Sequence, residues 1–80
     1  MPVKAQLLEV LESINPITDK KQYIVVYRLV ENGKIIVTNN FIIQQEDIEK
    51  SGLPFDLFVE RKLKEIAELY MKTKPKEVSV

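Results

Sequence analysis

Two runs of apolar residues, rich in β-branched and aromatic side chains, flank a short polar break near the middle of the chain. The runs cover residues 23–30 and 35–43, and the break is Glu31-Asn32-Gly33-Lys34. Asn-Gly is typical of a two-residue type I′ turn, because both residues tolerate the positive φ that this turn requires. The sequence therefore predicts a β-hairpin. Its facing residues are expected to be Glu31 with Lys34, Val30 with Ile35, Leu29 with Ile36, and Arg28 with Val37.

In this register both faces of the hairpin are apolar. One face has Tyr23, Val25, Tyr27, Leu29, Ile36 and Ile42; the other has Ile24, Val26, Val30, Ile35, Val37 and Phe41, with Arg28 as its single charge. Near-continuous apolar strands are typical of sheets that are covered on both sides. Because an isolated two-stranded ribbon is only marginally stable in water, we expect helices, a further strand or a second chain to cover it.

Residues 3–14 fit a helical period. Their larger apolar side chains fall within an arc of about 100° on a helical wheel, and Asn15-Pro16 is a helix stop signal. As a strand, the same segment would place Glu9 and Ser13 beside Leu7 and Leu11. We therefore predict an N-terminal helix, with a first strand that completes a three-stranded meander as the alternative.

The C-terminal half predicts two helical segments. Residues 44–50 fit a short helical turn that stops at Ser51-Gly52. Residues 55–71 have a continuous apolar side at helical spacing, interrupted by Lys62, and charged residues on the opposite side. The expected fold is a single α+β domain over residues 1–71, followed by a flexible Lys-rich tail over residues 72–80.

Composition narrows the chemistry that the chain can perform. Its 80 residues include no cysteine and no histidine, which excludes disulfides, thiolate zinc sites and a thiol nucleophile and removes the commonest general base. Glu46, Asp47 and Glu49 lack the spacing of a calcium loop. We expect no enzymatic activity, no metal and no cofactor.

Charge and hydropathy also bear on location and partners. The formal net charge of +0 argues against a globally basic nucleic-acid-binding protein. The N-terminal residues lack the basic stretch and apolar core of a secretory signal, and no apolar run approaches the roughly 18 residues of a membrane-spanning helix. These features favour a cytoplasmic protein, and the abundance of Lys, Glu, Ile and Val is compatible with a thermophilic source.

Two short helices have too few apolar side chains to cover both faces of the hairpin. In addition, unpaired strand edges recruit other strands. We therefore predict a two-fold homodimer, joined edge to edge or by packing of hairpin faces, that acts as a non-enzymatic protein-interaction or regulatory module. Arg28 is expected either to contact a carboxylate across the interface or to extend its head into solvent. The predicted interface residues are Val26, Arg28, Val37, Phe41 and Lys62.

The alternative hypothesis is a nucleic-acid-binding protein that uses the hairpin or the basic tail of a dimer. Its predicted contacts to nucleic acid are Lys20, Lys21, Arg28, Lys72, Lys74 and Lys76. Tyr23 and Tyr27 lie on one face of one predicted strand, where exposed rings would stack on bases. If a helix covers that face, they are ordinary core aromatics, which is the favoured interpretation.

Overall fold

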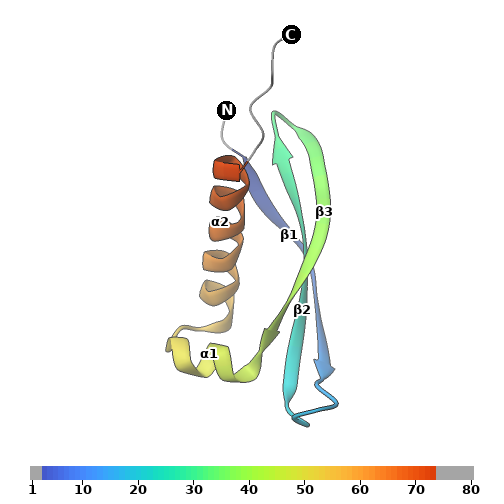
Figure 1. Cartoon of the computed structure of the whole chain (residues 1–80), viewed down its shortest axis with the longest axis vertical. Coiled ribbons are helices and arrows are strands. Elements are labelled where there is room, and N and C mark those ends of the chain that lie inside the picture. The colour runs from blue at the N-terminus through green and yellow to red at the C-terminus, as the bar shows by residue number, and fades with distance from the viewer. Residues whose placement is uncertain (1–2, 74–80) are drawn as a thin grey trace.

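The computed structural model describes residues 3–73, which form a three-stranded antiparallel sheet and two helices (Figure 1). The strands β1 (Lys4–Ile14), β2 (Lys21–Glu31) and β3 (Lys34–Gln44) form a meander with β2 in the centre. The helices α1 (Gln45–Ser51) and α2 (Phe55–Thr73) follow without a further strand. The α+β class is thereby confirmed.

The N-terminal segment is a strand, so the predicted N-terminal helix is wrong, and the alternative of a first strand that completes a three-stranded meander is confirmed. β1 pairs with β2 from Lys4, opposite Val30, to Ile14, opposite Lys21. This pairing satisfies backbone groups along one side of β2 that a helix would have left open. The pairing register shifts at Leu8, between Leu7 and Glu9. Such a β-bulge breaks the two-residue alternation of a strand, and here it imitates the spacing of a helix.

The hairpin closes at Asn32-Gly33, where φ is 54° and 73°. Glu31 pairs with Lys34 and Val30 pairs with Ile35, but Leu29 then pairs with Val37. Ile36 is therefore an extra residue in β3, and every later residue of this strand is displaced by one position. The predicted pairs of Leu29 with Ile36 and of Arg28 with Val37 are wrong, because the prediction assumed an unbroken register.

The shift exchanges the two faces of β3. Val37 and Phe41 pair with Leu29 and Val25, so they lie on the same face as the core residues of β2. Ile42 pairs with Ile24 on the opposite face. The predicted grouping of Val37 and Phe41 with Ile24 and Val26 is thus wrong, since directly paired residues share one face of a sheet.

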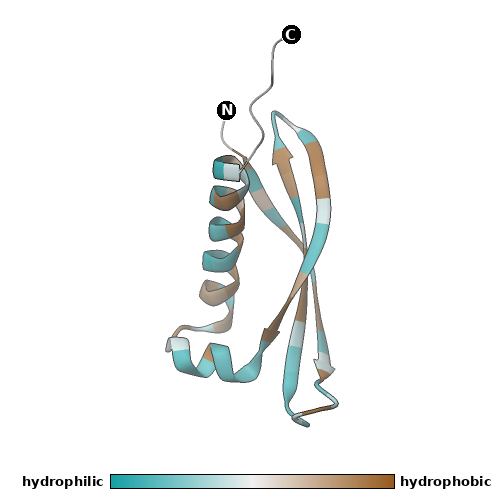
Figure 2. Ribbon diagram, viewed as in Figure 1, coloured by the Kyte–Doolittle hydropathy of each residue, from teal (hydrophilic) through white to brown (hydrophobic). Residues whose placement is uncertain are grey.

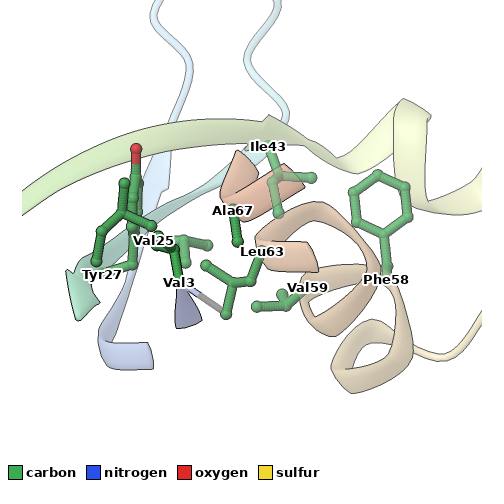
Figure 3. Packing of buried hydrophobic residues seen from close by; sticks show 9 residues of the cluster. Val3, Val25, Tyr27, Ile43, Phe58, Val59, Leu63 and Ala67 are labelled. Carbon is green, nitrogen blue, oxygen red and sulfur yellow. The ribbon is translucent and has the colours of Figure 1, made fainter. Parts of the chain in front are cut away.

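The core lies between α2 and one face of the sheet (Figure 3). Tyr27 is buried there, and its ring centre lies 5.7 Å from that of Phe41. The ring centre of Tyr23 lies 4.7 Å from that of Phe55, and the Tyr23 hydroxyl donates a hydrogen bond to Gln45. Both tyrosines are therefore used in packing. The buried residues are Val3, Val25, Tyr27, Leu29, Ile43, Phe58, Val59, Leu63 and Ala67.

Both helical predictions for the C-terminal half are confirmed. The short helix α1 ends at Gly52, whose φ of 70° is left-handed and whose N–H donates to the Glu49 carbonyl. α2 begins after Pro54 and continues two residues beyond the predicted end, through Lys72 to Thr73. Residues 74–80, which make up most of the predicted tail, lie outside the described residues.

Candidate protein-interaction surface

Both helices cover the same face of the sheet, and the other face is open (Figure 1). Ile24 and Val26 lie in the middle of this open face on β2, and they are half-buried by their neighbours. Ile35 and Ile42 on β3 are 58% and 54% exposed. The open face therefore presents apolar side chains that are direct cross-strand neighbours, such as Leu11, Ile24 and Ile42, among polar ones. The polar residues that share it are Lys4, Gln6, Glu9, Ser13, Gln22, Arg28, Thr38, Asn40 and Gln44.

Arg28 lies on the open face and is half-buried. Its Nε donates a hydrogen bond of 2.8 Å to Oε1 of Gln6, the residue directly opposite on β1. This contact ties the guanidinium to the neighbouring strand. Arg28 and Val26 thus belong to the open face, whereas the predicted interface residues Val37 and Phe41 belong to the helix-covered face. The predicted interface set does not form one surface.

A second apolar surface follows β3 on the helix-covered face. α2 packs over β1 and β2, and among the described residues no Cα of α2 lies within 8 Å of a Cα of β3. The space left between them is a groove of about 530 Å³. Leu69, at its edge, is 60% exposed. The apolar lining consists of Phe41, Ile42, Ile43, Phe58, Ile66 and Leu69, and the charged rim of Asp47, Lys50, Lys62 and Glu65.

Lys62 belongs to the rim of this groove. Its Nζ lies 5.7 Å from the centre of the Phe58 ring and 3.9 Å from the Glu65 carboxylate on the same helix. The ammonium is thereby held over an aromatic face while half of the side chain remains in solvent, as expected for a long cationic side chain at the margin of a core. Of the acidic residues of α1, only Asp47 belongs to the same rim.

The two edge strands differ in their charges. β1 carries Glu9 and Glu12, and Glu12 forms an ion pair of 2.9 Å with Lys21 on β2. The hydrogen bond from Lys21 to the Glu12 carboxylate, together with the negative charge of Glu12, raises the pKa of Lys21 above its ordinary value. β3 has no charged residue between Lys34 and its end at Gln44. Its sequence, IIVTNNFII over residues 35–43, was the available signal for this unprotected edge.

The basic residues of the nucleic-acid hypothesis do not gather in one place. Lys20 pairs with Glu46 at 3.3 Å, and Lys21 pairs with Glu12. Both lie near the β1–β2 connection, at the opposite end of the molecule from Lys72 in the last turn of α2 (Figure 1). Lys74 and Lys76 lie outside the described residues. The predicted contacts that lie within residues 3–73 thus do not form one continuous basic surface for a phosphate backbone to follow.

The part of the chain that the structure describes has few features suited to catalysis or metal binding. It contains no buried polar or charged side chain and no cluster of three acidic, cysteine or histidine residues that would hold a metal ion. No helix in residues 3–73 has the length and hydrophobicity needed to cross a membrane. No protein-family model, curated protein or solved structure matches the chain.

Proposed function

We propose that this protein is a protein-interaction module that acts as a homodimer, and that its working part is a surface rather than a reactive group. One observation carries the proposal. Among the described residues, 13 large apolar side chains are exposed whereas nine hydrophobic residues are buried. Exposed apolar surface in this amount typically marks a protein–protein contact.

The location of these side chains also supports a contact made by the sheet. Nine of the 13 exposed apolar residues lie on the two edge strands, and none lies on the central strand β2. An 80-residue chain is close to the lower limit for a self-sufficient core, so association is a physically reasonable way to bury what the chain leaves exposed. The exposed residues on the edge strands are Leu7, Leu8, Val10, Leu11, Ile14, Ile35, Ile36, Val37 and Ile42.

Size-exclusion chromatography with light scattering tests the proposal. The expected result is a mass of twice 9.3 kDa at high concentration, with a transition to the monomer only after dilution. The melting temperature should rise with protein concentration, because association stabilises the folded state by mass action. A cooperatively folded monomer at every concentration, with a concentration-independent melting temperature, contradicts the homodimer.

A further inference from the structure

We propose that the second copy binds at β3, and that β3 pairs with β3 of the partner in antiparallel orientation about Asn39. The product is a continuous six-stranded sheet with the helices of both copies on one face. This inference rests on the proposed homodimer and adds the edge and the register at which it forms. Three observations on β3 carry it.

The first observation is that β3 lacks the features by which edge strands avoid pairing. Natural edges are blocked by charged side chains, proline or bulges along their length. Within β3 the residues from 35 to 43 include neither a charge nor a proline, and its bulge at Ile36 lies near one end. Residues 37–44 keep an unbroken register with β2. This is a long, regular and uncharged edge, which is the kind that recruits another strand.

The second observation concerns the backbone of Asn40. Its N–H donates 2.8 Å to Oδ1 of the Asn39 side chain. Such a bond indicates that this N–H points away from β2. Because the outward direction alternates along a strand, the backbone groups of Thr38 and Ile42 also point outward. The outward N–H of Asn40 is the donor that a neighbouring strand would bond, and in the proposed pairing the Asn39 side chain releases it to the partner strand.

The third observation is the symmetry of the strand. Figure 2 shows β3 as hydrophobic toward both ends and hydrophilic in its middle. Antiparallel pairing about Asn39 places Val37 opposite the partner's Phe41 and Thr38 opposite the partner's Asn40. Apolar residues then meet apolar ones and polar residues meet polar ones on the two faces. A register centred one residue later places Asn39 opposite Phe41 and Thr38 opposite Ile42.

Pairing in this register also completes the groove between α2 and β3. β3 forms one wall of that groove and α2 the other, so the free edge of β3 is the outer margin of the groove. Val37 of the partner would lie beside Phe41 and extend the apolar lining across the two-fold axis. The grooves of the two copies then join into one depression flanked by both α2 helices. Neither copy can form this depression alone.

Single-cysteine variants test the register directly, because the natural chain has no cysteine. Asn39→Cys is the diagnostic variant. Opposed residues in a non-hydrogen-bonded antiparallel pair have Cα atoms about 4.5 Å apart, which fits a disulfide, whereas Asn40→Cys would lie diagonally at about 7–8 Å. Under mild oxidation, Asn39→Cys should form a covalent dimer at least about tenfold faster than Asn40→Cys, because disulfides do not bridge Cα atoms more than about 7 Å apart.

The controls separate the possible failures. Glu9→Cys reports pairing through β1, and Ile24→Cys reports packing of open faces. If Asn40→Cys is oxidised faster than Asn39→Cys, the register is wrong. If light scattering shows a dimer but only Glu9→Cys or Ile24→Cys is cross-linked, β3 is not the interface and the homodimer proposal stands. If no variant is cross-linked and the parent protein stays monomeric, both proposals fail.

Discussion

The two edge strands of the sheet have the same length and similar hydrophobicity, but they offer a second chain very different edges. β1 has two glutamates and a bulge at Leu8 near its middle, and α2 lies over it. β3 has no internal charge, has its bulge near one end, and is separated from α2 by a groove. Exposed apolar residues occur on both strands, so hydrophobicity alone does not select the interface. The difference lies in which backbone edge is accessible and uncharged.

The strongest test of this comparison places a carboxylate at equivalent positions on the two edges. Val37 and Leu7 lie on the same face of the sheet and are 39% and 49% exposed. Val37→Asp should weaken the proposed dimer by roughly 100-fold or more, because an unpaired charge would be buried opposite Phe41 of the partner. Leu7→Asp should leave the dissociation constant within about twofold, as is usual for an exposed substitution outside an interface.

Analytical ultracentrifugation gives the dissociation constants of both variants, and circular dichroism checks that each monomer is folded. An equal loss of association in the two variants would remove the distinction between the edges. An unchanged mass for Val37→Asp would show that this position is exposed in the assembled protein.

A smaller effect is expected from charges placed directly opposite each other on the outer face of β3. In the proposed register, Thr38→Lys with Asn40→Lys brings like charges together twice across the two-fold axis, whereas Thr38→Lys with Asn40→Glu brings opposite charges together twice. Cross-strand charge pairs contribute about 0.2–1 kcal/mol each, so the two double variants should differ by roughly tenfold in dissociation constant. The same measurement at high salt should reduce the difference. Equal affinities would contradict pairing centred on Asn39.

The smallest expected effect concerns the ion pair that protects β1. The pKa of Lys21 is raised by Glu12, so the stabilisation is fully present below the pKa of the unfolded chain and is lost as pH rises through the folded-state pKa. In Glu12→Gln, a nuclear magnetic resonance titration of the Lys21 side chain should show a lower pKa than in the parent protein. The thermal stabilities of the two proteins should converge at strongly alkaline pH. Because the pair is exposed, association should be unaffected, and an altered dimer mass would place β1 in the interface.

The sequence was sufficient to predict elements that have their own local signals. Asn32-Gly33 marked the hairpin connection, Gly52 marked the end of α1, and the apolar period of residues 55–71 identified α2. Each of these signals depends on neighbouring residues along the chain, such as a positive φ or a helical spacing. Tertiary context was not needed for them.

The two errors have a common physical cause, which is a bulge within a run of apolar residues. Leu8 follows Leu7, and Ile36 follows Ile35, so no polar residue marks the position at which the alternation slips. In β1 the bulge brings Leu7 and Val10, which are three residues apart in the sequence, to the same face of the sheet. This spacing is also that of neighbouring residues on one side of a helix. In β3 the bulge transfers Val37 and Phe41 to the helix-covered face. A one-residue insertion in an unbroken apolar run has no signature in the sequence pattern.

The candidate site was predicted only in part for the same reason. Arg28 and Val26 lie on the open face, whereas Val37 lies on the helix-covered face and Phe41 and Lys62 line the groove there. The importance of the β3 edge depends on where α2 lies. The amphipathic pattern of α2 indicates that it covers a sheet, but it does not indicate which strand it leaves uncovered.

The bulged and charged edge of β1 has a consequence for the size of the assembly. Once the two β3 strands have paired, the only remaining sheet edges are the two copies of β1, one at each end. There the Glu12–Lys21 ion pair and the irregular backbone at Leu8 discourage further strand addition. In the proposed dimer, strand addition would therefore stop at two copies, because β1, which forms both outer edges of the six-stranded sheet, is a poor template for a further chain and keeps a self-complementary protein from growing into fibres.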